Sequence, residues 1–228
     1  MTAVVPPPRP ATATLLPVRQ LSRFEDGERL HSLLWQAGAG WRMISSAVLG
    51  GGVGERAWVL NAQVSHGYRR HDPDRHLAEL ARQAGAEGAG VGLMTAADVR
   101  AYGHGADEGV VAVATAGLGV RGWAAAAPEA LAAPSRPGTI NIVVALPVAM
   151  TDAALVNAVA TATEAKVQAL LDMGYDCSGT PTDAVCVAAR TPVDGEEVHA
   201  FAGPRSLWGA RLARAVHRAV RGAAPALR

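Results

Sequence analysis

The chain has 228 residues, 50% of them hydrophobic but only 4% aromatic, so any core must consist mainly of alanine, valine and leucine. Twenty-one basic and twenty acidic residues leave a net charge of +1, which provides no overall field for nucleic acid or an anionic membrane. Cys177 and Cys186 fit no metal-ligand spacing and are expected to be reduced. No apolar run is long enough for a membrane span and no signal peptide is recognised, so a cytoplasmic protein is expected.

The N-terminal stretch is rich in proline. Residues 1–17 carry five prolines and are expected to form an extended leader. No second linker and no long repeat follow. One domain is therefore predicted over residues 18–228.

Two strand-like stretches, 41–49 and 56–64, flank a glycine-rich segment and predict a hairpin. In the second stretch, alternation places Asn61 and Gln63 on the same face. These two amides either face water or bind amide groups of a ligand.

The next elements alternate between helix and strand. Asp72 and Pro73 are a good N-cap and first-turn pair and predict a helix over about 73–84. His71 and His76 are expected at the surface, because their spacing is poor for a shared metal. Further elements are expected as follows: a strand at 90–95, a short helix at 96–102, a strand at 109–115 and a mobile loop near the site at 119–137.

The central segment predicts strand, helix and strand. Residues 139–146 form an apolar, β-branched run that Pro147 is expected to close. Thr151 and Asp152 begin a helix that continues to about Gly174. Residues 184–189 then form a second buried strand.

A lysine interrupts the apolar face predicted for this helix. Lys166 lies within the apolar arc, whereas Glu164 lies well away from it. Either the lysine stem packs while its ammonium reaches water, or the lysine lines a pocket and pairs with a carboxylate or with substrate. The arc itself consists of Leu155, Val156, Val159, Thr163, Val167, Leu170 and Met173.

Residues 206–221 predict an amphipathic helix with a row of arginines, for which a solvated face is favoured over binding of lipid or nucleic acid. The order of elements predicts an α+β fold in which one or two mixed sheets are layered with helices. A doubly wound α/β sheet is the alternative.

Six strings, in order, resemble the motifs of the adenosylcobinamide amidohydrolase family over about residues 40–222. The resemblance implies hydrolysis of the amide that joins the aminopropanol arm to the corrin ring, leaving adenosylcobyric acid, in corrinoid salvage. Related sequences tend to have Asn near position 119, where this chain has Gly119. The strings are GLMTAA (92–97), TAGL (115–118), GTINI (138–142), TATEAK (161–166), SGTPTDA (178–184) and AGPRSLWG (202–209).

The resemblance also bears on cofactors and partners. The substrate is itself a cobalt corrinoid, and no separate cofactor or metal site is expected, while a metal requirement stays open. The partner expected is this small molecule, with a homo-oligomer left open; neither nucleic acid nor a membrane is expected.

Candidate site residues follow from the chemistry of amide hydrolysis. No Ser–His–Asp arrangement, GxSxG or HExxH is visible, and histidine is absent from all six strings. Carboxylates, hydroxyls, amides and a lysine must then do the work. The catalytic candidates are Glu164, Lys166, Thr180, Thr182 and Asp183, and the substrate-binding candidates are Asn61, Gln63, Thr95, Thr115, Asn141, Thr163 and Ser178.

Two mechanisms compete. In the first, Glu164 or Asp183 activates water while Lys166 or Asn141 stabilises the oxyanion. In the second, a threonine hydroxyl attacks and Lys166 activates it. Water attack is slightly favoured, because no threonine has an identifiable base beside it. The loop 178–183 could also be a tight turn that caps its own backbone.

Two other functions stay open from the sequence. A corrinoid-binding protein would use the polar strand faces only to hold side-chain amides. An amidase or acyltransferase for another substrate would share the chemistry but not the ligand.

Overall fold

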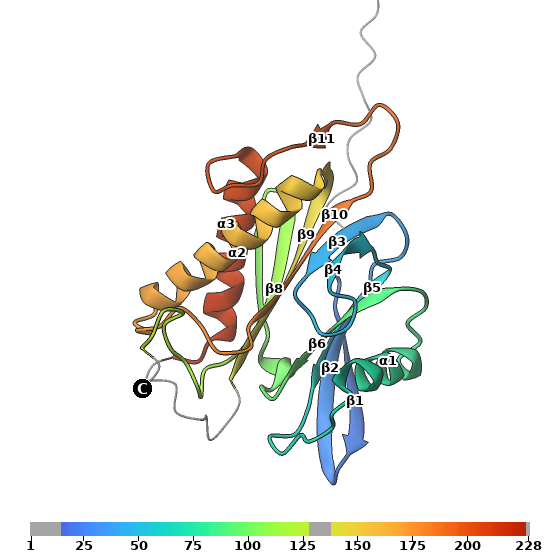
Figure 1. Ribbon diagram of the computed structural model, residues 1–228, viewed down its shortest axis with the longest axis vertical. Coiled ribbons are helices and arrows are strands. Elements are labelled where there is room, and N and C mark those ends of the chain that lie inside the picture. Colours follow the sequence, from blue (N-terminus) through green and yellow to red (C-terminus); the bar gives the residue numbers. More distant parts are fainter. Residues whose placement is uncertain (1–14, 128–137, 227–228) are drawn as a thin grey trace, which may run out of the picture.

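The computed structural model describes residues 15–127 and 138–226, and these form four layers (Figure 1). Helices α2 and α3 cover one face of a large sheet. The other face of this sheet packs on a small sheet, and α1 covers the outside of the small sheet. The prediction of an α+β fold with mixed sheets is therefore confirmed, and a single doubly wound sheet is excluded.

The small sheet has four strands in the order β1-β2-β5-β6. β1 and β2 form an antiparallel hairpin, and β5 pairs antiparallel with β2 but parallel with β6. Its strands are β1 (Arg19–Glu25), β2 (Glu28–Gln36), β5 (Trp58–Gln63) and β6 (Gly90–Thr95), and its covering helix is α1 (Pro73–Gln83).

The large sheet has the order β4-β3-β10-β9-β8-β7, and the short strand β11 pairs with β9 beside this path. β9 and β10 are parallel neighbours that α2 connects, and the neighbours on either side are antiparallel. Its elements are β3 (Trp41–Ser45), β4 (Gly52–Glu55), β7 (Gly103–Asp107), β8 (Val110–Gly117), β9 (Thr139–Met150), α2 (Asp152–Asp172), β10 (Ala184–Arg190), β11 (Val198–His199) and α3 (Leu207–Ala223).

The predicted hairpin over 41–49 and 56–64 is wrong. β3 pairs with β4, which lies within the glycine-rich stretch, whereas β5 belongs to the small sheet. β5 is buried on both faces, whereas β3 buries Trp41 and Met43 on one face and only partly buries Ile44 on the other, so β3 and β5 both carry apolar residues on both faces. Apolar content therefore could not indicate their partners.

The strand β9 does not end at Pro147. Its pairing with β8 ends at Ala145, and the register with β10 shifts between Ala188 and Arg190. Proline lacks an N–H group, so it is tolerated where ladder pairing is interrupted.

Residues 96–102 form only a short 3-10 helix, η1 (Val99–Ala101), rather than the helix expected there.

The buried face of α2 also differs from the predicted arc. Val156 is 58% exposed and Thr163 is exposed, because the helix packs through its alanines, which allow a close approach to the sheet. Lys166 lies on this buried face, as predicted. The buried residues are Ala154, Leu155, Ala158, Thr161, Ala162, Ala165, Lys166, Ala169 and Leu170.

The predicted leader falls mostly outside the described residues. Within it, Leu16 is described and is only 1% exposed, because it packs in the layer between the two sheets. His76, expected at the surface, is buried as well. Its imidazole nitrogens lie 3.1 Å from a Glu25 carboxylate oxygen and 3.1 Å from the Tyr68 hydroxyl.

Candidate active site

Lys166 forms an ion pair with Asp183. The two side chains are 9% and 12% exposed, and Lys166 Nζ lies 2.5 Å from Asp183 Oδ2. α2 supplies the lysine, and the carboxylate comes from the residue just before β10. Lys166 therefore pairs with a carboxylate instead of extending to water.

Three further donors bind Asp183. Its Oδ1 accepts from the backbone N–H of Ile140 at 2.9 Å and from Thr180 Oγ1 at 2.5 Å, and its Oδ2 accepts from the Thr180 N–H at 3.2 Å. A Cβ at Gly179 would lie 2.2 Å from Asp183 Oδ2 and 2.6 Å from Lys166 Nζ, so the loop needs glycine there. Together with Lys166, these bonds occupy about four lone-pair positions, the full acceptor capacity of a carboxylate.

Three threonine hydroxyls meet beside this carboxylate. Thr139 Oγ1 lies 2.7 Å from Thr182 Oγ1, and the backbone carbonyl of Gly138 accepts from Thr180 Oγ1 at 2.9 Å and Thr182 Oγ1 at 3.0 Å. The expectation that no threonine has a base beside it is wrong for Thr180, which touches a carboxylate. We call Gly138, Thr139, Lys166, Thr180, Thr182 and Asp183 the threonine–lysine cluster.

The segment that precedes residue 128 lies against the loop of the cluster. The N–H of Gly122 donates to Gly179 O, and Ser178 Oγ accepts from Ala124 N at 2.7 Å. Trp123 is 44% exposed, and its indole Nε1 donates to a carboxylate oxygen of Asp176 at 3.1 Å. The described part of the predicted loop is thus near the cluster, while residues 128–137 lie outside the described residues.

Four predicted substrate-binding residues lie buried between the sheets. Asn61 Nδ2 donates to Thr115 Oγ1 at 2.9 Å, and Asn141 Nδ2 donates to Asn61 Oδ1 at 2.8 Å. Thr95 Oγ1 accepts from the Ala97 N–H. Oδ1 of Asn141 has no partner among the described residues. The structure joins Asn61, Thr115 and Asn141 in one network but does not expose it.

The other predicted residues lie apart from the cluster. Glu164 and Thr163 are exposed on the solvent side of α2, and Thr163 Oγ1 donates to the Val159 carbonyl of its own helix. The side-chain oxygen of Gln63 accepts from the backbone N–H of His31. Of the two candidate carboxylates, only Asp183 therefore reaches the hydroxyls.

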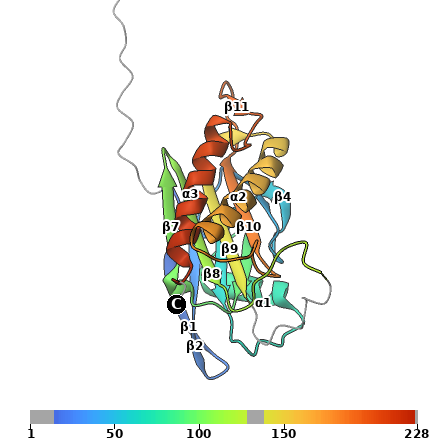
Figure 2. The same cartoon turned by 90° about the vertical axis from the view of Figure 1, so that its left-hand side faces the viewer.

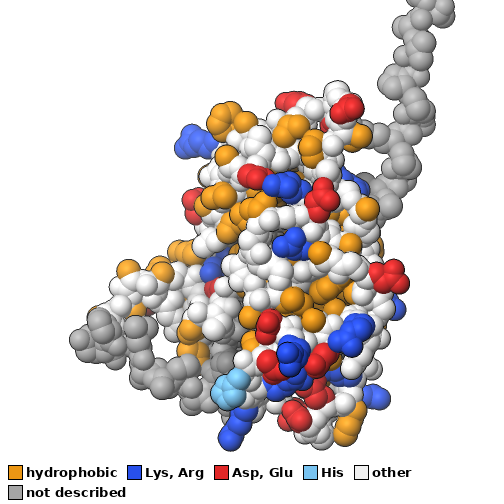
Figure 3. Space-filling view, turned by 45° about the vertical axis from the view of Figure 1, so that its right-hand side comes forward, with side chains coloured by type: hydrophobic (Ala, Val, Ile, Leu, Met, Phe, Trp, Pro, Cys, Tyr) orange, Lys and Arg blue, Asp and Glu red, His pale blue; other side chains and the backbone are white. Residues whose placement is uncertain are grey.

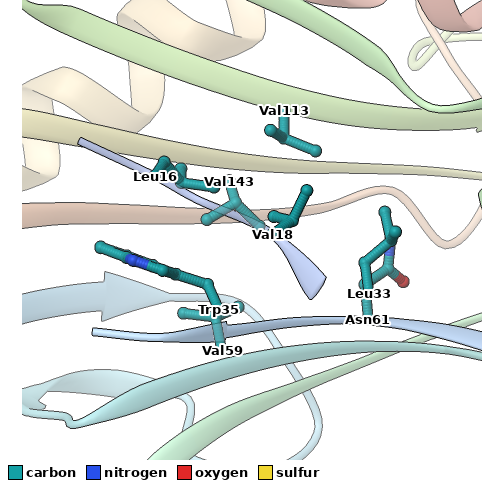
Figure 4. Close-up of a pocket in the computed structure, with 8 residues that line it drawn as sticks. All are labelled: Leu16, Val18, Leu33, Trp35, Val59, Asn61, Val113 and Val143. Carbon is teal, nitrogen blue, oxygen red and sulfur yellow. The ribbon is translucent and has the colours of Figure 1, made fainter. Parts of the chain in front are cut away.

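Two hollows formed by the described residues differ greatly in size. A cavity of only about 10 Å³ lies between the sheets (Figure 4). A surface groove of about 470 Å³ lies beside α1, near Arg56, Trp58 and Arg82, and none of the predicted site residues lines it. The cavity is lined by Leu16, Val18, Leu33, Trp35, Val59, Asn61, Val113 and Val143.

The arginine row on α3 is paired with acids of the β7–β8 turn, next to which the helix lies (Figure 2). Arg214 and Arg218 both bind Asp107, and Arg211 pairs with Glu108. Hydrogen bonds from Arg214 and then Arg218 hold the pKa of Asp107 below its ordinary value. Basic and acidic side chains also lie side by side on the face shown in Figure 3. Three arginines of the row, Arg211, Arg214 and Arg218, thus have local counter-charges.

Sequence reasoning missed two residues of this region. Thr139 belongs to the string GTINI, but only Asn141 of that string was selected. Its position at the head of a strand, directly after glycine, was the available signal. Trp123 had no signal, because only the folded loop brings it beside Ser178.

Three groups converge here that can act on a carbonyl carbon: hydroxyls as nucleophiles, an ammonium group and a held carboxylate. These groups, together with the family match and the relatives given next, define the class of the protein as a hydrolase of amide bonds. The chain belongs to the adenosylcobinamide amidohydrolase family, whose model matches residues 17–227, so the resemblance of the six strings is confirmed.

The chain is similar to two relatives and to one solved structure, at different levels of sequence identity. An adenosylcobinamide amidohydrolase of Methanosarcina mazei is 32% identical over 183 residues, covering 77% of this chain and 86% of that protein. One from Halobacterium salinarum is 43% identical over 95 residues, 41% of this chain and 38% of that protein. The crystal structure of the PH0078 protein from Pyrococcus horikoshii aligns with a TM-score of 0.47 at 11% identity, covering 90% and 83% of the two chains.

The described part of the chain was also inspected for membrane spans and metal-ligand groups. None of its helices combines the length and apolarity that a membrane crossing requires. Nor do three or more His, Cys, Asp or Glu side chains gather within it in a way that could hold a metal ion.

Proposed function

We propose that this chain hydrolyses the amide that joins the aminopropanol arm to the corrin ring of adenosylcobinamide, and that it releases adenosylcobyric acid. The family of the chain supports the substrate, because both relatives named above carry the name of this activity. The cluster supports the chemistry.

One observation gives this proposal its strongest support. Three strings that are far apart in the sequence, 138–142, 161–166 and 178–184, meet at the threonine–lysine cluster through direct hydrogen bonds. A purely structural role would not require a buried ammonium and three adjoining hydroxyls at the end of a sheet, since burying charge is costly.

The size of the substrate bears on where it binds. A corrinoid is far larger than the inter-sheet cavity, so the amide arm must reach the cluster from the surface. Pro181 and Thr182 are exposed. The half-exposed indole of Trp123 offers a flat apolar surface near the same loop, because its neighbours Gly122 and Ala124 are bonded to Gly179 and Ser178. Asn61, Thr115 and Asn141 are buried, and contact of these three with substrate stays a prediction.

The roles of the charged groups follow from their bonds. All acceptor positions of Asp183 are occupied, so it can take a proton from water only by giving up one of these bonds. We assign it the role of holding Lys166 and Thr180 in place. Lys166 supplies positive charge near the developing oxyanion, a role that preorganised donors fill in amide hydrolysis.

The test is incubation of the purified protein with adenosylcobinamide, followed by mass detection of free aminopropanol and of the cobyric acid product. Parallel reactions with a chelator and with added divalent metal separate a metal requirement from inactivity. Glu164→Gln serves as a matched carboxylate control for Asp183→Asn, because Glu164 is exposed and outside the cluster. Tight corrinoid binding without product under any of these conditions would favour a corrinoid-binding protein.

A further inference from the structure

We propose that Thr139 is the nucleophile of this hydrolase, and that the chain first cleaves its own Gly138–Thr139 bond to free the amino group that activates it. The role of Thr139 in substrate turnover rests on the proposed function. The self-cleavage does not, because it can be observed without any substrate.

The first support is the position of Thr139. It is the first residue of β9, and its side chain is 6% exposed. A single hydroxyl, that of Thr182, lies 2.7 Å from Thr139 Oγ1 and 3.0 Å from the carbonyl oxygen of Gly138. The hydroxyl of Thr139 and the preceding carbonyl are therefore held against the same group.

The second support is the environment of the Gly138 carbonyl. It accepts from two side-chain hydroxyls, those of Thr180 and Thr182. Hydroxyl donors aimed at one carbonyl oxygen are the arrangement that stabilises an oxyanion when that carbon is attacked. Thr182 can accept from Thr139 and donate to Gly138, whereas the one proton of Thr180 is shared between Gly138 and Asp183.

The third support is that, in the uncut chain, none of the described residues offers Thr139 a base. Among the described residues, its hydroxyl has Thr182 as its hydrogen-bond partner, and another hydroxyl is not a base. A threonine nucleophile can instead use its own α-amino group, whose pKa of about 7.7–8.0 suits this task. That nitrogen is locked in an amide for as long as Gly138 is attached.

The cleavage is a balanced pair of steps. Thr139 Oγ1 attacks the carbonyl carbon of Gly138, the C–N bond breaks, and the hydroxyl proton ends on the released amine, which leaves an ester. Water then hydrolyses the ester and gives a carboxylate on Gly138 and a free hydroxyl and amine on Thr139. Water is the only co-reactant, as in the hydrolysis of the substrate.

The packing around Gly138 is consistent with a cleavage site at the Gly138–Thr139 bond. A Cβ at this position would lie 2.6 Å from Val120 O and 2.7 Å from Gly117 O, so the backbone is pinned closely and no larger residue fits. The sheet also tolerates the break, because β9 and β10 lie between β8 and β3 in the large sheet. The two fragments would remain paired on both sides.

The same groups then serve the substrate. Once Gly138 is no longer bonded to Thr139, Thr180 and Thr182 can donate to the carbonyl of an incoming amide. The free α-amine takes the proton of Thr139 Oγ1 as this oxygen attacks that carbon. The amide C–N bond then breaks, and the aminopropanol nitrogen leaves with the proton from the resulting α-ammonium group. Water hydrolyses the remaining ester, which releases the acid and restores the hydroxyl.

The test is denaturing electrophoresis and intact mass measurement of the purified full chain, with N-terminal sequencing of the fragments. We expect residues 1–138 and 139–228, with masses that sum to that of the chain plus one water. The Gly179–Thr180 bond is a matched internal control and should stay intact, because the Thr180 hydroxyl is bonded to Asp183 and Gly138.

Variants separate self-cleavage from proteolysis. Thr139→Ser should still be cut, Thr139→Ala should remain one chain, and Ser22→Ala, on an exposed part of β1, should be cut like the parent. Circular dichroism checks that Thr139→Ala is folded. Its turnover of adenosylcobinamide should fall below about a thousandth of the parent rate, as when a hydrolase loses its nucleophile.

The outcomes separate the two proposals. Cleavage at Thr139 without turnover of adenosylcobinamide would support self-cleavage and count against the proposed substrate. An uncut parent chain that hydrolyses adenosylcobinamide would overturn the self-cleavage, and so would cleavage of Thr139→Ala at the same bond. Normal turnover by Thr139→Ala would remove Thr139 from the reaction altogether.

Discussion

The ion pair of Lys166 and Asp183 gives the sharpest stability prediction. Lys166→Met keeps most of the stem volume and removes the ammonium that lies 2.5 Å from Asp183 Oδ2. Because the carboxylate is only 12% exposed, the variant leaves a largely buried negative charge without its cation.

The magnitude follows from what Asp183 retains. Removing one partner of a buried pair costs about 3–5 kcal/mol. Asp183 keeps its bonds from Ile140 and Thr180, so the low end, about 3 kcal/mol, is expected. For a chain of this size, that corresponds to a fall of about 6–12 °C in Tm.

The assay is thermal and urea unfolding at pH 7, in the Thr139→Ala background so that every sample is one covalent chain. Arg42→Met is the matched control, because Arg42 binds Asp152 at 2.6 Å but both side chains are well exposed, and such pairs contribute under about 1 kcal/mol. Lys166→Met with Asp183→Asn should cost less than the sum of the single changes. A loss below about 1 kcal/mol for Lys166→Met alone would refute this reasoning.

Three further predictions concern other groups. Burial raises the pKa of Cys186 to about 12 and that of Cys177 above its ordinary value, so a thiol reagent should label neither residue until the protein is unfolded, and rapid native labelling would contradict this. Burial lowers the pKa of His76 below 6.5. As the pH drops, the unfolded state is therefore protonated first, and the free energy of unfolding falls below about pH 6.5. Urea unfolding between about pH 7.5 and about pH 5.5 should show a smaller loss of this free energy for His76→Gln than for the parent. Glu164→Gln should keep its turnover. Asp183→Asn should lose about a hundredfold, because Lys166 and Thr180 lose the carboxylate that positions them; equal rates would remove Asp183 from the site.

The sequence predicted which segments form elements better than it predicted how they pair. Elements such as α1 and β6 follow from local signals of capping and apolar pattern. The pairing of β3 with β10 does not follow from local signals, because it joins Ser45 to Cys186, which lie far apart in the sequence. Both strands are largely apolar, like the other buried strands, so apolar content does not specify this pairing. The strand β7 was missed, since Gly103 and Gly105 replace apolar side chains where α3 lies closest to the sheet.

For the site, helix geometry was sufficient to single out Lys166, because a charge on a buried face requires a partner. The same geometry placed Glu164 away from it, and Glu164 is exposed outside the cluster. A catalytic role of Glu164 stays a prediction. Thr139, whose hydroxyl contacts that of Thr182, could not be singled out from the sequence by a neighbouring base, because none adjoins it there. The network of Asn61 and Asn141 depends on contact between two sheets, which no single segment encodes.

The order of strands in the large sheet has a consequence for synthesis on the ribosome. The partner of β3 is β10, whose pairing joins Trp41 to Arg190, so the sheet cannot close until most of the chain has emerged. Until then, one edge of β3 lacks its neighbour, and exposed strand edges invite association with other chains. Such long-range pairing also slows folding. Production of this protein should therefore respond to slower translation or lower temperature more than that of a helical protein of equal length.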